Sequence, residues 1–302
     1  MKLTILGCYS ATPRMLTNPT SQVLDINNHL FLIDCGEGTQ VQLRKFKIKF
    51  FRIKHIFISH LHGDHVYGLV GLISTFKMLK REAPLHVYGP KGIKEMITIQ
   101  LKLSNSWTDF PLHFHELESN ESELIYEDEK VTVRTIPLQH RIYCNGFLFT
   151  EKPKDRNLNL GVVLNYNIDV AYYNSIKKGK DITLESGEVI PNATLTFDPE
   201  PVKSYAFCSD TKYDELKIEL IKNATVLYHE STFLESHEHL CEYTGHSTAK
   251  QAATMAKKAG VKNLILGHYS TRYGNISDFK EEAKNIFENT ALADDGKVFE
   301  WS

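Results

Sequence analysis

Short apolar segments, each ending in small or polar residues, recur along the chain and predict buried β-strands. In the first half these segments are KLTILG, NHLFLIDCGEG, HIFIS and LHVYGP. Runs rich in β-branched and aromatic residues are typical of strands that are covered on both faces. The intervening segments VYGLVGLISTFKMLK and KGIKEMITIQLKL carry apolar residues at helical spacing. They are therefore predicted to be helices.

The second half of the chain repeats this order. VTVRTIPLQH, SYAFCSD, ATVLYHEST and KNLILGHYS are further predicted strands. STAKQAATMAKKAG is a predicted helix, with Ser247 as its N-cap and Gly260 as its C-terminal stop. Strands that alternate with helices in both halves predict a layered α/β domain with two similar halves.

Residues 151–191 do not follow this alternation. The segment starts with the charged run EKPKDRN and contains the basic run SIKKGKD and the turn-like ESGEV. We interpret it as an insertion between the halves that forms a projecting hairpin or arm. From composition alone, an ordinary long surface excursion explains it equally well.

The densest chemistry lies directly after the predicted strand HIFIS, in the run His60-Leu-His62-Gly-Asp64-His65. His60 and His62 alternate and point the same way from an extended strand end, and Gly63 allows a tight turn. Asp64 and His65 then begin the next helix and project differently from the first pair. Imidazole and carboxylate suit a borderline cation such as zinc. Two ions that share this loop fit the spacing better than one ion does.

Other metal-binding side chains follow predicted strands in the same way. They are His140 after VTVRTIPLQ, Asp210 after SYAFCS and His268 after NLILG. In an open α/β sheet, side chains at the carboxyl ends of the strands converge on a cleft. One such residue alone is more often a capping or surface residue, but three of them together with the histidine cluster favour a metal centre.

Two further histidine pairs have ligand-like spacing but lie in charged segments, and we predict that they are solvated. They are His113 with His115 and His237 with His239. The run HESTF begins like a zinc-protease helix, yet Phe233 stands where that motif requires its second histidine. The HExxH interpretation therefore fails.

Composition and charge narrow the class of protein. With 302 residues, 42% hydrophobic and 24% charged, the chain suits one large domain or two smaller ones. A net charge of −2 predicts no strong overall attraction to nucleic acid, so a polyanion site needs a local patch. RKFKIKFFRIKH, from Arg44 to His55, and the lysines and arginines of residues 151–191 offer such patches. Solvated basic surface is the simpler interpretation of each run.

Cysteine usage and hydropathy bear on the compartment. The five cysteines are scattered and never spaced as CxxC, which argues against a disulfide framework and fits a reducing cytosol. The opening apolar run is too short for a signal peptide, and no segment approaches the ~18 apolar residues of a membrane span. We therefore expect a cytoplasmic protein.

The cluster, taken with the three strand-end residues, resembles the metal-ligand series of the metallo-β-lactamase fold. This resemblance implies an α/β fold, a four-layer αββα sandwich that spans residues 1–302 as one domain and carries the inserted arm at 151–191. It also implies two zinc ions per subunit. One is held by His60, His62 and His140, the other by Asp64, His65 and His268, and Asp210 bridges the two.

More of the chain is similar to one branch of that superfamily. DCGEGTQVQLRK, SHLHGDHVYGLVGL, VYGPKGIK, HESTF, GHSTAKQAA and GHYSTRY together resemble ribonuclease Z, the tRNA 3′-processing endonuclease, in its short form. The resemblance implies removal of the 3′ trailer from precursor tRNA, with a 3′-hydroxyl on tRNA and a 5′-phosphate on the trailer. It implies Asp64 as general base, His246 as proton donor with Glu230 behind it, a homodimer, and an arm that grips the tRNA elbow.

The chain departs from the family in two places. The Gly-Pro-rich arm tip is replaced by NYNIDVAYYN, and SIKKGKDITLESGEVI resembles the returning strand of the arm. In the PxKxRN loop, associated in the family with sensing the tRNA 3′ end, this chain has Pro13-Arg-Met15-Leu-Thr17-Asn18. Met15 and Thr17 thus stand at the two basic positions.

Two other hypotheses compete with a tRNA endonuclease. One keeps the metallohydrolase but assigns it a small phosphodiester, such as a cyclic nucleotide; the arm segment argues against it. The other is a catalytically silent RNA-binding module. That module predicts lost ligands, whereas every ligand position of the family is filled in this chain.

Overall fold

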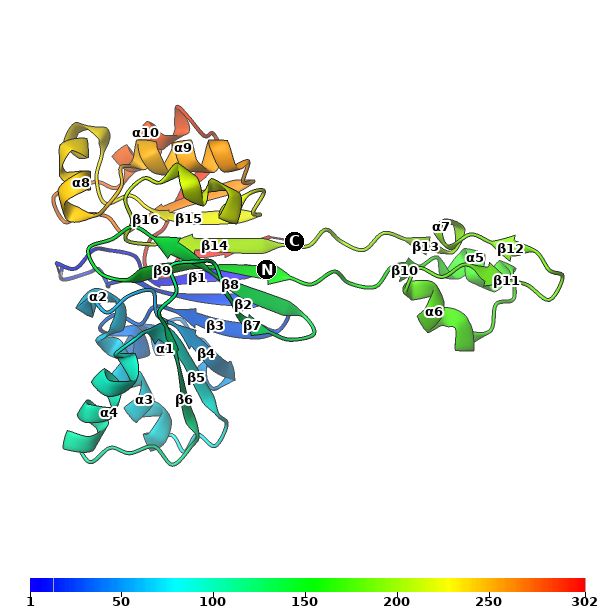
Figure 1. Ribbon diagram of the computed structural model, residues 1–302, viewed down its shortest axis with the longest axis horizontal. Coiled ribbons are helices and arrows are strands. Elements are labelled where there is room, and N and C mark those ends of the chain that lie inside the picture. The colour runs from blue at the N-terminus through cyan, green and yellow to red at the C-terminus, as the bar shows by residue number, and fades with distance from the viewer. Residues whose placement is uncertain (13, 302) are drawn as a thin grey trace. The chain divides into compact units, whose positions relative to one another are not determined.

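The computed structural model describes residues 1–12 and 14–301, and it divides into two compact units. The first unit comprises Met1–Thr150 together with the chain from Ser204 onwards, and the second unit comprises Glu151–Lys203. Figure 1 shows the elements of both units. Among the described residues, no helix combines the length and the apolar character needed to cross a membrane.

The first unit contains two seven-stranded sheets. In spatial order, the first sheet consists of β18 (Val298–Glu300), β1 (Lys2–Gly7), β2 (Ser21–Ile26), β3 (His29–Ile33), β4 (Ile53–Phe57), β5 (Leu85–Pro90) and β6 (Leu112–Leu117). Its strands are antiparallel from β18 to β3 and parallel from β3 to β6. β6 is an edge strand.

The second sheet has a similar plan. In spatial order it consists of β17 (Thr290–Leu292), β16 (Asn263–Gly267), β15 (Val226–Glu230), β14 (Ser204–Cys208), β9 (Cys144–Glu151), β8 (Val131–Leu138) and β7 (Leu124–Glu127). β14 to β17 are parallel, and β9 is antiparallel to β14, with Thr150 paired to Ser204. Each sheet therefore has a parallel half, as the repeated sequence order predicted.

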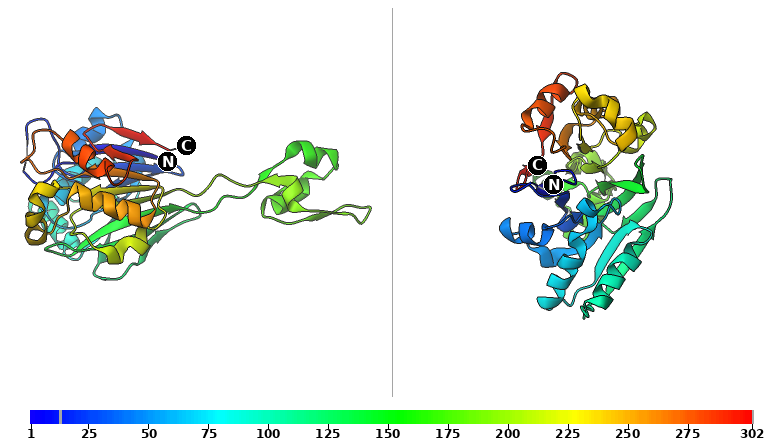
Figure 2. Two further views of the ribbon diagram at one scale, coloured as in Figure 1. Left: turned by 90° about the horizontal axis from the view of Figure 1, so that it is seen from above. Right: turned by 90° about the vertical axis from the view of Figure 1, so that its left-hand side faces the viewer.

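Helices cover the outer face of each sheet (Figures 1 and 2). On the first sheet they are α1 (Thr39–Lys45), η1 (Phe50–Arg52), α2 (Gly63–Val66), α3 (Gly68–Met78) and α4 (Ile93–Leu103). On the second they are η3 (Glu215–Ile221), η4 (Glu235–Leu240), α8 (Cys241–Thr244), α9 (Ala249–Ala259) and α10 (Ser277–Lys284). The four-layer αββα arrangement predicted from the sequence is confirmed.

The end of strand β4 shows why the central strands finish in consecutive apolar residues. Ile56 packs with Phe76 of α3 in the core beneath the helices, while Phe57 points into the core between the two sheets. There its ring lies 5.2 Å from that of Phe149 on β9. Because alternate side chains of a strand face opposite sides, the part of a strand that is covered on both sides needs apolar residues at consecutive positions. Lys54 and His55, earlier in β4, are exposed and partly exposed.

One helix boundary differs from the prediction. Helix α9 is capped by Thr248, not by Ser247: the Thr248 side chain accepts from Gln251 N, and the Gln251 side chain bonds back to Thr248 N. This reciprocal capping box satisfies two backbone donors. The hydroxyl of Ser247 instead donates to the Thr211 carbonyl. Gly260 ends the helix in the left-handed region, as predicted.

The second unit has its own small core and is more helical than an extended arm. Its elements are β10 (Asn157–Leu158), α5 (Leu160–Asn165), η2 (Val170–Tyr172), α6 (Tyr173–Lys177), β11 (Ile182–Thr183), β12 (Val189–Ile190), α7 (Asn192–Leu195) and β13 (Thr196–Phe197). Val163, Ile176 and Leu195 are fully buried within it. The predicted returning strand SIKKGKDITLESGEVI is wrong at its start, because Ile176 anchors α6 and only β11 and β12 pair as a short hairpin.

Candidate metal centre and active site

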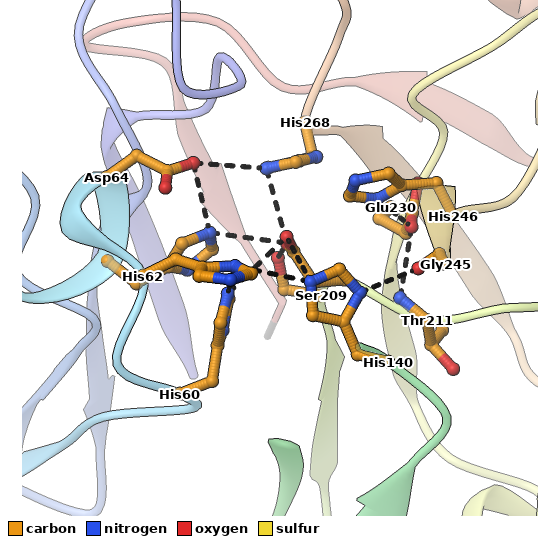
Figure 3. A network of polar contacts seen from close by, with 12 residues as sticks. His60, His62, Asp64, His140, Ser209, Thr211, Glu230, Gly245, His246 and His268 are labelled. Carbon is orange, nitrogen blue, oxygen red and sulfur yellow. Dashed lines mark hydrogen bonds and ion pairs between the residues drawn. The ribbon is translucent and has the colours of Figure 1, made fainter. Parts of the chain in front are cut away.

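Side chains from four strand ends and one short helix meet at one edge of the two sheets (Figure 3). His60 and His62 follow β4, and Asp64 and His65 lie in α2; the remaining members follow β8, β14 and β16 and are His140, Asp210 and His268. Their possible ligand atoms form two groups, each within 4.8 Å: His60, His62, His140 and Asp210, and Asp64, His65 and His268. The structure thus brings together every residue that the sequence singled out as a metal ligand.

Asp210 faces both groups, one carboxylate oxygen to each. Its Oδ2 lies 3.6 Å from His60 Nε2 and 3.8 Å from His140 Nε2. Its Oδ1 lies 3.2 Å from Nε2 of both His65 and His268. A carboxylate in this position can join two neighbouring cations.

Within each group, ring nitrogens converge on a common point. His62 Nδ1 lies 3.0 Å from His60 Nε2 and 3.3 Å from His140 Nε2. In the other group, Asp64 Oδ2 lies 3.3 Å from His65 Nε2 and 3.5 Å from His268 Nε2. Lone pairs that point at one another in this way are stabilised by a cation between them.

The second nitrogen of most rings has an oxygen partner that fixes the orientation of the ring. His140 Nδ1 donates to the Gly245 carbonyl at 2.8 Å. His60 Nδ1 lies 3.0 Å from Ser59 Oγ, and His268 Nδ1 lies 2.9 Å from Thr232 Oγ1. Such partners select the tautomer that turns the other nitrogen towards a metal.

Asp34 is a member of this network that our sequence analysis did not single out. Its Oδ2 lies 2.7 Å from His65 Nδ1, and the carboxylate accepts from Ser59 N at 2.7 Å and Ser59 Oγ at 2.9 Å. Asp34 is fully buried at the end of β3. The only signal for it was its place after an apolar strand, within the DCGEG motif.

The backbone around the centre is tightly constrained. Asp34, Asp210 and His268 have φ values of 54°, 39° and 61°, a region that residues other than glycine rarely adopt. Strain of this kind costs about 1–3 kcal/mol per residue and clusters at functional sites. Beside them, a Cβ on Gly68 would lie 2.0 Å from the Gly36 carbonyl oxygen, so the loop after β3 packs on α3 only because glycine is present.

The charges of the centre fit a cation. Burial disfavours the ionised form of Asp64 and Asp210, yet the surrounding histidines hold the pKa values of both carboxylates below their usual range. Burial lowers the pKa of His65, but Asp210, Asp64 and Asp34 raise it well above its usual value. The acidic ring of side chains around His65 therefore demands positive charge.

Buried ring nitrogens lead to the same conclusion. Nε2 of His65 and Nε2 of His268 are buried and make no hydrogen bond among the described residues. A buried polar atom without a partner is costly. Because these two atoms border carboxylate oxygens, the donor set of imidazoles and carboxylates fits metal ions of the zinc type.

His246 and Glu230 form a separate pair beside the centre. His246 Nδ1 lies 2.8 Å from Glu230 Oε1, and Glu230 accepts from Thr211 N, Thr232 N and Thr232 Oγ1 at 3.0, 2.9 and 2.7 Å. Burial works against both charges, but their mutual attraction lowers the pKa of Glu230 and raises the pKa of His246 to about 9. The imidazole is therefore charged at neutral pH.

A cleft of about 390 Å³ opens onto these groups. Its lining includes Asp64, His246 and His268, together with Arg141 and Phe233. The imidazole of His246 retains 12% exposure and borders this cleft. A cleft of this size with convergent charged groups is typical of a small-ligand or catalytic site.

The remaining histidines lie away from the centre. His229 is buried, with Nδ1 donating to the Glu230 carbonyl. His237 lies beside Tyr273, whose hydroxyl is 2.9 Å from its Nδ1, and His239 is exposed. His113 and His115 are exposed on β6, as predicted, although both contact another histidine.

In the loop before β2, Pro13 lies outside the described residues. Arg14 donates to the carbonyls of Thr271 and Tyr273, and the Asn18 amide donates to Asp295 at 2.7 Å. Met15 is 94% exposed. The loop therefore exposes an apolar side chain at the first of the two positions where its sequence departs from the PxKxRN pattern.

Comparison with known proteins extends these observations. Ribonuclease Z of Bacteroides thetaiotaomicron is 47% identical over 97% of this chain and 92% of its own length. Human tRNase Z, short form, has a similar structure, with a TM-score of 0.74, 28% identity and 99% of both chains covered. The metallo-β-lactamase fold protein YhfI from Bacillus subtilis superposes with a TM-score of 0.69 over 99% of both chains, at 18% identity.

A match to a family model covers part of the chain. The model described as Anti-Pycsar protein Apyc1 matches residues 1–172, which include the His60–His65 cluster and His140 but end before Asp210, Glu230, His246 and His268. The structural neighbours show that the fold is that of the metallo-β-lactamases. The chain belongs to the ribonuclease Z family and, through residues 1–172, also to the family described as Anti-Pycsar protein Apyc1.

Proposed function

We propose that this protein is a zinc-dependent endoribonuclease that removes the 3′ trailer from precursor tRNA. The observation that carries the proposal is the Asp210 carboxylate, whose two oxygens face two separate sets of metal-binding side chains. Paired cations suit phosphodiester hydrolysis, because both the attacking and the leaving oxygen need charge stabilisation. Ribonuclease Z relatives that match over nearly the whole chain support precursor tRNA as the substrate.

The arrangement accommodates two zinc ions per subunit. The residues that would hold them are His60, His62 and His140 for one ion and Asp64, His65 and His268 for the other, with Asp210 shared. When bound, the zinc pair neutralises the phosphate and lowers the pKa of water. Ser59, Asp34, Gly245 and Thr232 orient the rings.

Asp64 is the proposed general base. Its pKa is held below the usual value, so the carboxylate is ionised at neutral pH and can accept a proton from the attacking water. It borders the cleft, and its Oδ2 lies beside His65 and His268.

His246 is the proposed general acid, and Glu230 is its positioning residue. Because the Glu230 carboxylate accepts a hydrogen bond from His246 Nδ1, the proton on His246 Nε2 remains free to be donated to the leaving 3′ oxygen of the tRNA. Protonation of that oxygen leaves a 3′-hydroxyl on the tRNA and a 5′-phosphate on the trailer. A pKa of about 9 keeps the donor charged across the neutral range.

The test is incubation of the purified protein with zinc and a 3′-extended precursor tRNA, followed by mapping of both product ends. We expect one cut at the 3′ side of the tRNA, with a 3′-hydroxyl and a 5′-phosphate, and no cut in the presence of a chelator. A product with a 3′-phosphate, or cleavage that survives the chelator, contradicts the proposed chemistry.

Cleavage of a small phosphodiester such as a cyclic nucleotide is the competing hypothesis. The second unit supports tRNA, because Lys177, Lys178 and Lys180 are exposed on it, and so are Tyr172 (54%) and Phe197 (57%). Basic groups with aromatic rings are typical of nucleic-acid surfaces. Arg156 is engaged with Thr196 and Asp198 and serves the structure of the unit.

Removal of the second unit separates these hypotheses. Thr150 and Ser204 are strand partners, so a tight turn can replace residues 151–203 without stretching β9 or β14. We expect this variant to keep its activity on a chromogenic phosphodiester and to lose precursor tRNA processing. Retention of tRNA processing would refute the role of the second unit as the substrate-binding arm predicted at 151–191.

We also propose a homodimer in the cytoplasm. The five cysteines are free and buried, which fits a reducing compartment. The dimer rests on the family resemblance and is tested by sedimentation equilibrium of the zinc-loaded protein.

The exposed lysines and arginines of residues 44–54 are the proposed tRNA-facing patch of the first unit, so tRNA affinity should fall steeply with salt.

A further inference from the structure

A second group of histidines crosses the first sheet, outside the candidate metal centre. We call it the histidine row: His55 on β4, His86 on β5, and His113 and His115 on β6. His55 pairs with His86, and His86 pairs with His113, as direct neighbours across the parallel strands. Their rings stack, with centroids 5.1 Å apart for His55 and His86 and 4.8 Å apart for His86 and His113.

The row contains one close approach of nitrogens. His86 Nδ1 lies 3.0 Å from His115 Nε2, on the exposed side of the row. The ring of Tyr88 stacks on that of His115, with centroids 4.3 Å apart and planes 10° apart, which holds the His115 ring in place. The pair is thus preorganised by neighbouring rings on two strands.

This separation matches two ligands of one ion. With zinc–nitrogen bonds of about 2.0–2.1 Å, two imidazole nitrogens on the same ion lie about 3 Å apart. We propose that His86 and His115 form a second transition-metal site, which takes zinc or a similar divalent ion, with water at the remaining positions. It differs from the catalytic ligands proposed above and does not depend on them.

The electrostatic environment leaves both lone pairs available. Burial lowers the pKa of both rings, and the neighbouring histidines lower it further. Burial and the surrounding histidines also lower the pKa of His55 to about 4. His55, His86 and His115 are therefore mainly uncharged near pH 7 and do not repel a cation.

The histidine row lies along the strands, away from the candidate metal centre at their carboxyl ends. His55 is the middle residue of β4, whereas His60 follows the end of that strand. Five residues of extended chain span about 16 Å, too far for a shared ion.

Because β6 is an edge strand, an ion held by His86 and His115 would fasten this edge to β5. Without such protection, an edge strand exposes unpaired backbone N–H and C=O groups to other chains.

The test counts zinc at equilibrium. The full-length protein, His115→Asn and His86→Asn are dialysed against a series of free zinc concentrations, and bound zinc per chain is measured by elemental analysis. His237→Asn is the matched control, because His237 and His239 have the same sequence spacing as His113 and His115 but their ring centroids lie 6.1 Å apart. Precursor tRNA cleavage by each variant reports separately on the proposed function.

We expect both row variants to bind one zinc ion fewer per chain than the wild type, while His237→Asn matches the wild type. The melting temperature of the wild type should also rise as zinc is added beyond the catalytic ions, and that of His115→Asn should not. Equal zinc counts for the wild type and both row variants at every concentration overturn the inference. The exposed position of His115 makes its variant the safer test of a folded protein, and circular dichroism verifies the fold of both.

Discussion

Two regions of the first sheet carry histidine clusters with different surroundings. At the carboxyl ends of the strands, histidines meet Asp64 and Asp210, and a third carboxylate, Asp34, stands behind His65. In the histidine row, the paired rings of His86 and His115 contact other rings. Histidine density is similar, but only the first cluster concentrates negative charge.

This difference separates the proposed catalytic centre from the proposed second metal site. Buried carboxylates are stabilised by a cation and bind it strongly. In the candidate metal centre, oxygen partners also fix the orientation of the histidine rings. A pair of neutral rings provides ligands but no compensating charge, so its affinity depends on geometry alone. The spacing H-x-H occurs in both places and does not distinguish them.

The largest effect is expected from removal of the carboxylate that makes the first cluster different. Asp210→Ala should lose the zinc of the candidate metal centre and leave no detectable precursor tRNA cleavage, because Asp210 faces both ligand groups. Zinc analysis and a cleavage assay measure this. The control is Glu242→Ala, an acidic side chain that is 85% exposed and pairs with Lys212. Full zinc content in Asp210→Ala would place the bridging role elsewhere.

The next effect concerns proton donation rather than metal binding. His246→Ala should lower the cleavage rate about 10²–10⁴-fold, the usual contribution of a general acid, while zinc content stays at the wild-type level. His239→Ala, which changes an exposed histidine of η4, is the matched control. Parallel loss of zinc and activity in His246→Ala would instead make His246 a ligand, since it lies within ligand distance of Asp210 and His268.

A smaller effect is expected from the carboxylate behind His65. Asp34→Asn keeps the shape but removes the charge 2.7 Å from His65 Nδ1. Loss of such a partner typically weakens metal affinity about 10–100-fold. Cleavage should therefore fall at low zinc and recover when zinc is added in excess. Activity that stays low at saturating zinc would show that Asp34 acts on folding or catalysis directly.

The smallest effect at neutral pH is a shift of the pH profile. Glu230 holds the pKa of His246 at about 9, against the effect of burial. In Glu230→Gln the pKa of His246 falls, so His246 loses its proton at a lower pH than in the wild type. The alkaline fall in the cleavage rate should therefore begin about 1–3 pH units lower. The rate at pH 6 should change least. An unchanged alkaline limb would mean that another group titrates there.

The layered fold and the convergence of the predicted ligand side chains were accessible from the sequence because both follow local rules. Apolar runs define strands, and His140, Asp210 and His268 stand directly after strands whose ends must converge. The partners of the rings were not accessible in this way. Asp34 and His65 are separated by 31 residues, and the Gly245 carbonyl is a backbone atom that no residue type identifies.

The second unit and the histidine row show the same limit. The family resemblance predicted a strand for the segment around Ile176, but this segment is helical and packs in a core that includes Val163 and Leu195. His115 belongs to a charged segment and was predicted to be solvated. Its nitrogen nevertheless meets His86 on a different strand, 29 residues away.

The way in which the second unit joins the first has an evolutionary consequence. Thr150 and Ser204 are neighbours across β9 and β14, so the chain leaves and re-enters the sheet at one point. An insertion at such a point changes neither the register of the strands nor the direction of the side chains at their far ends. Selection can therefore lengthen, reshape or discard the inserted unit without moving the side chains of the candidate metal centre.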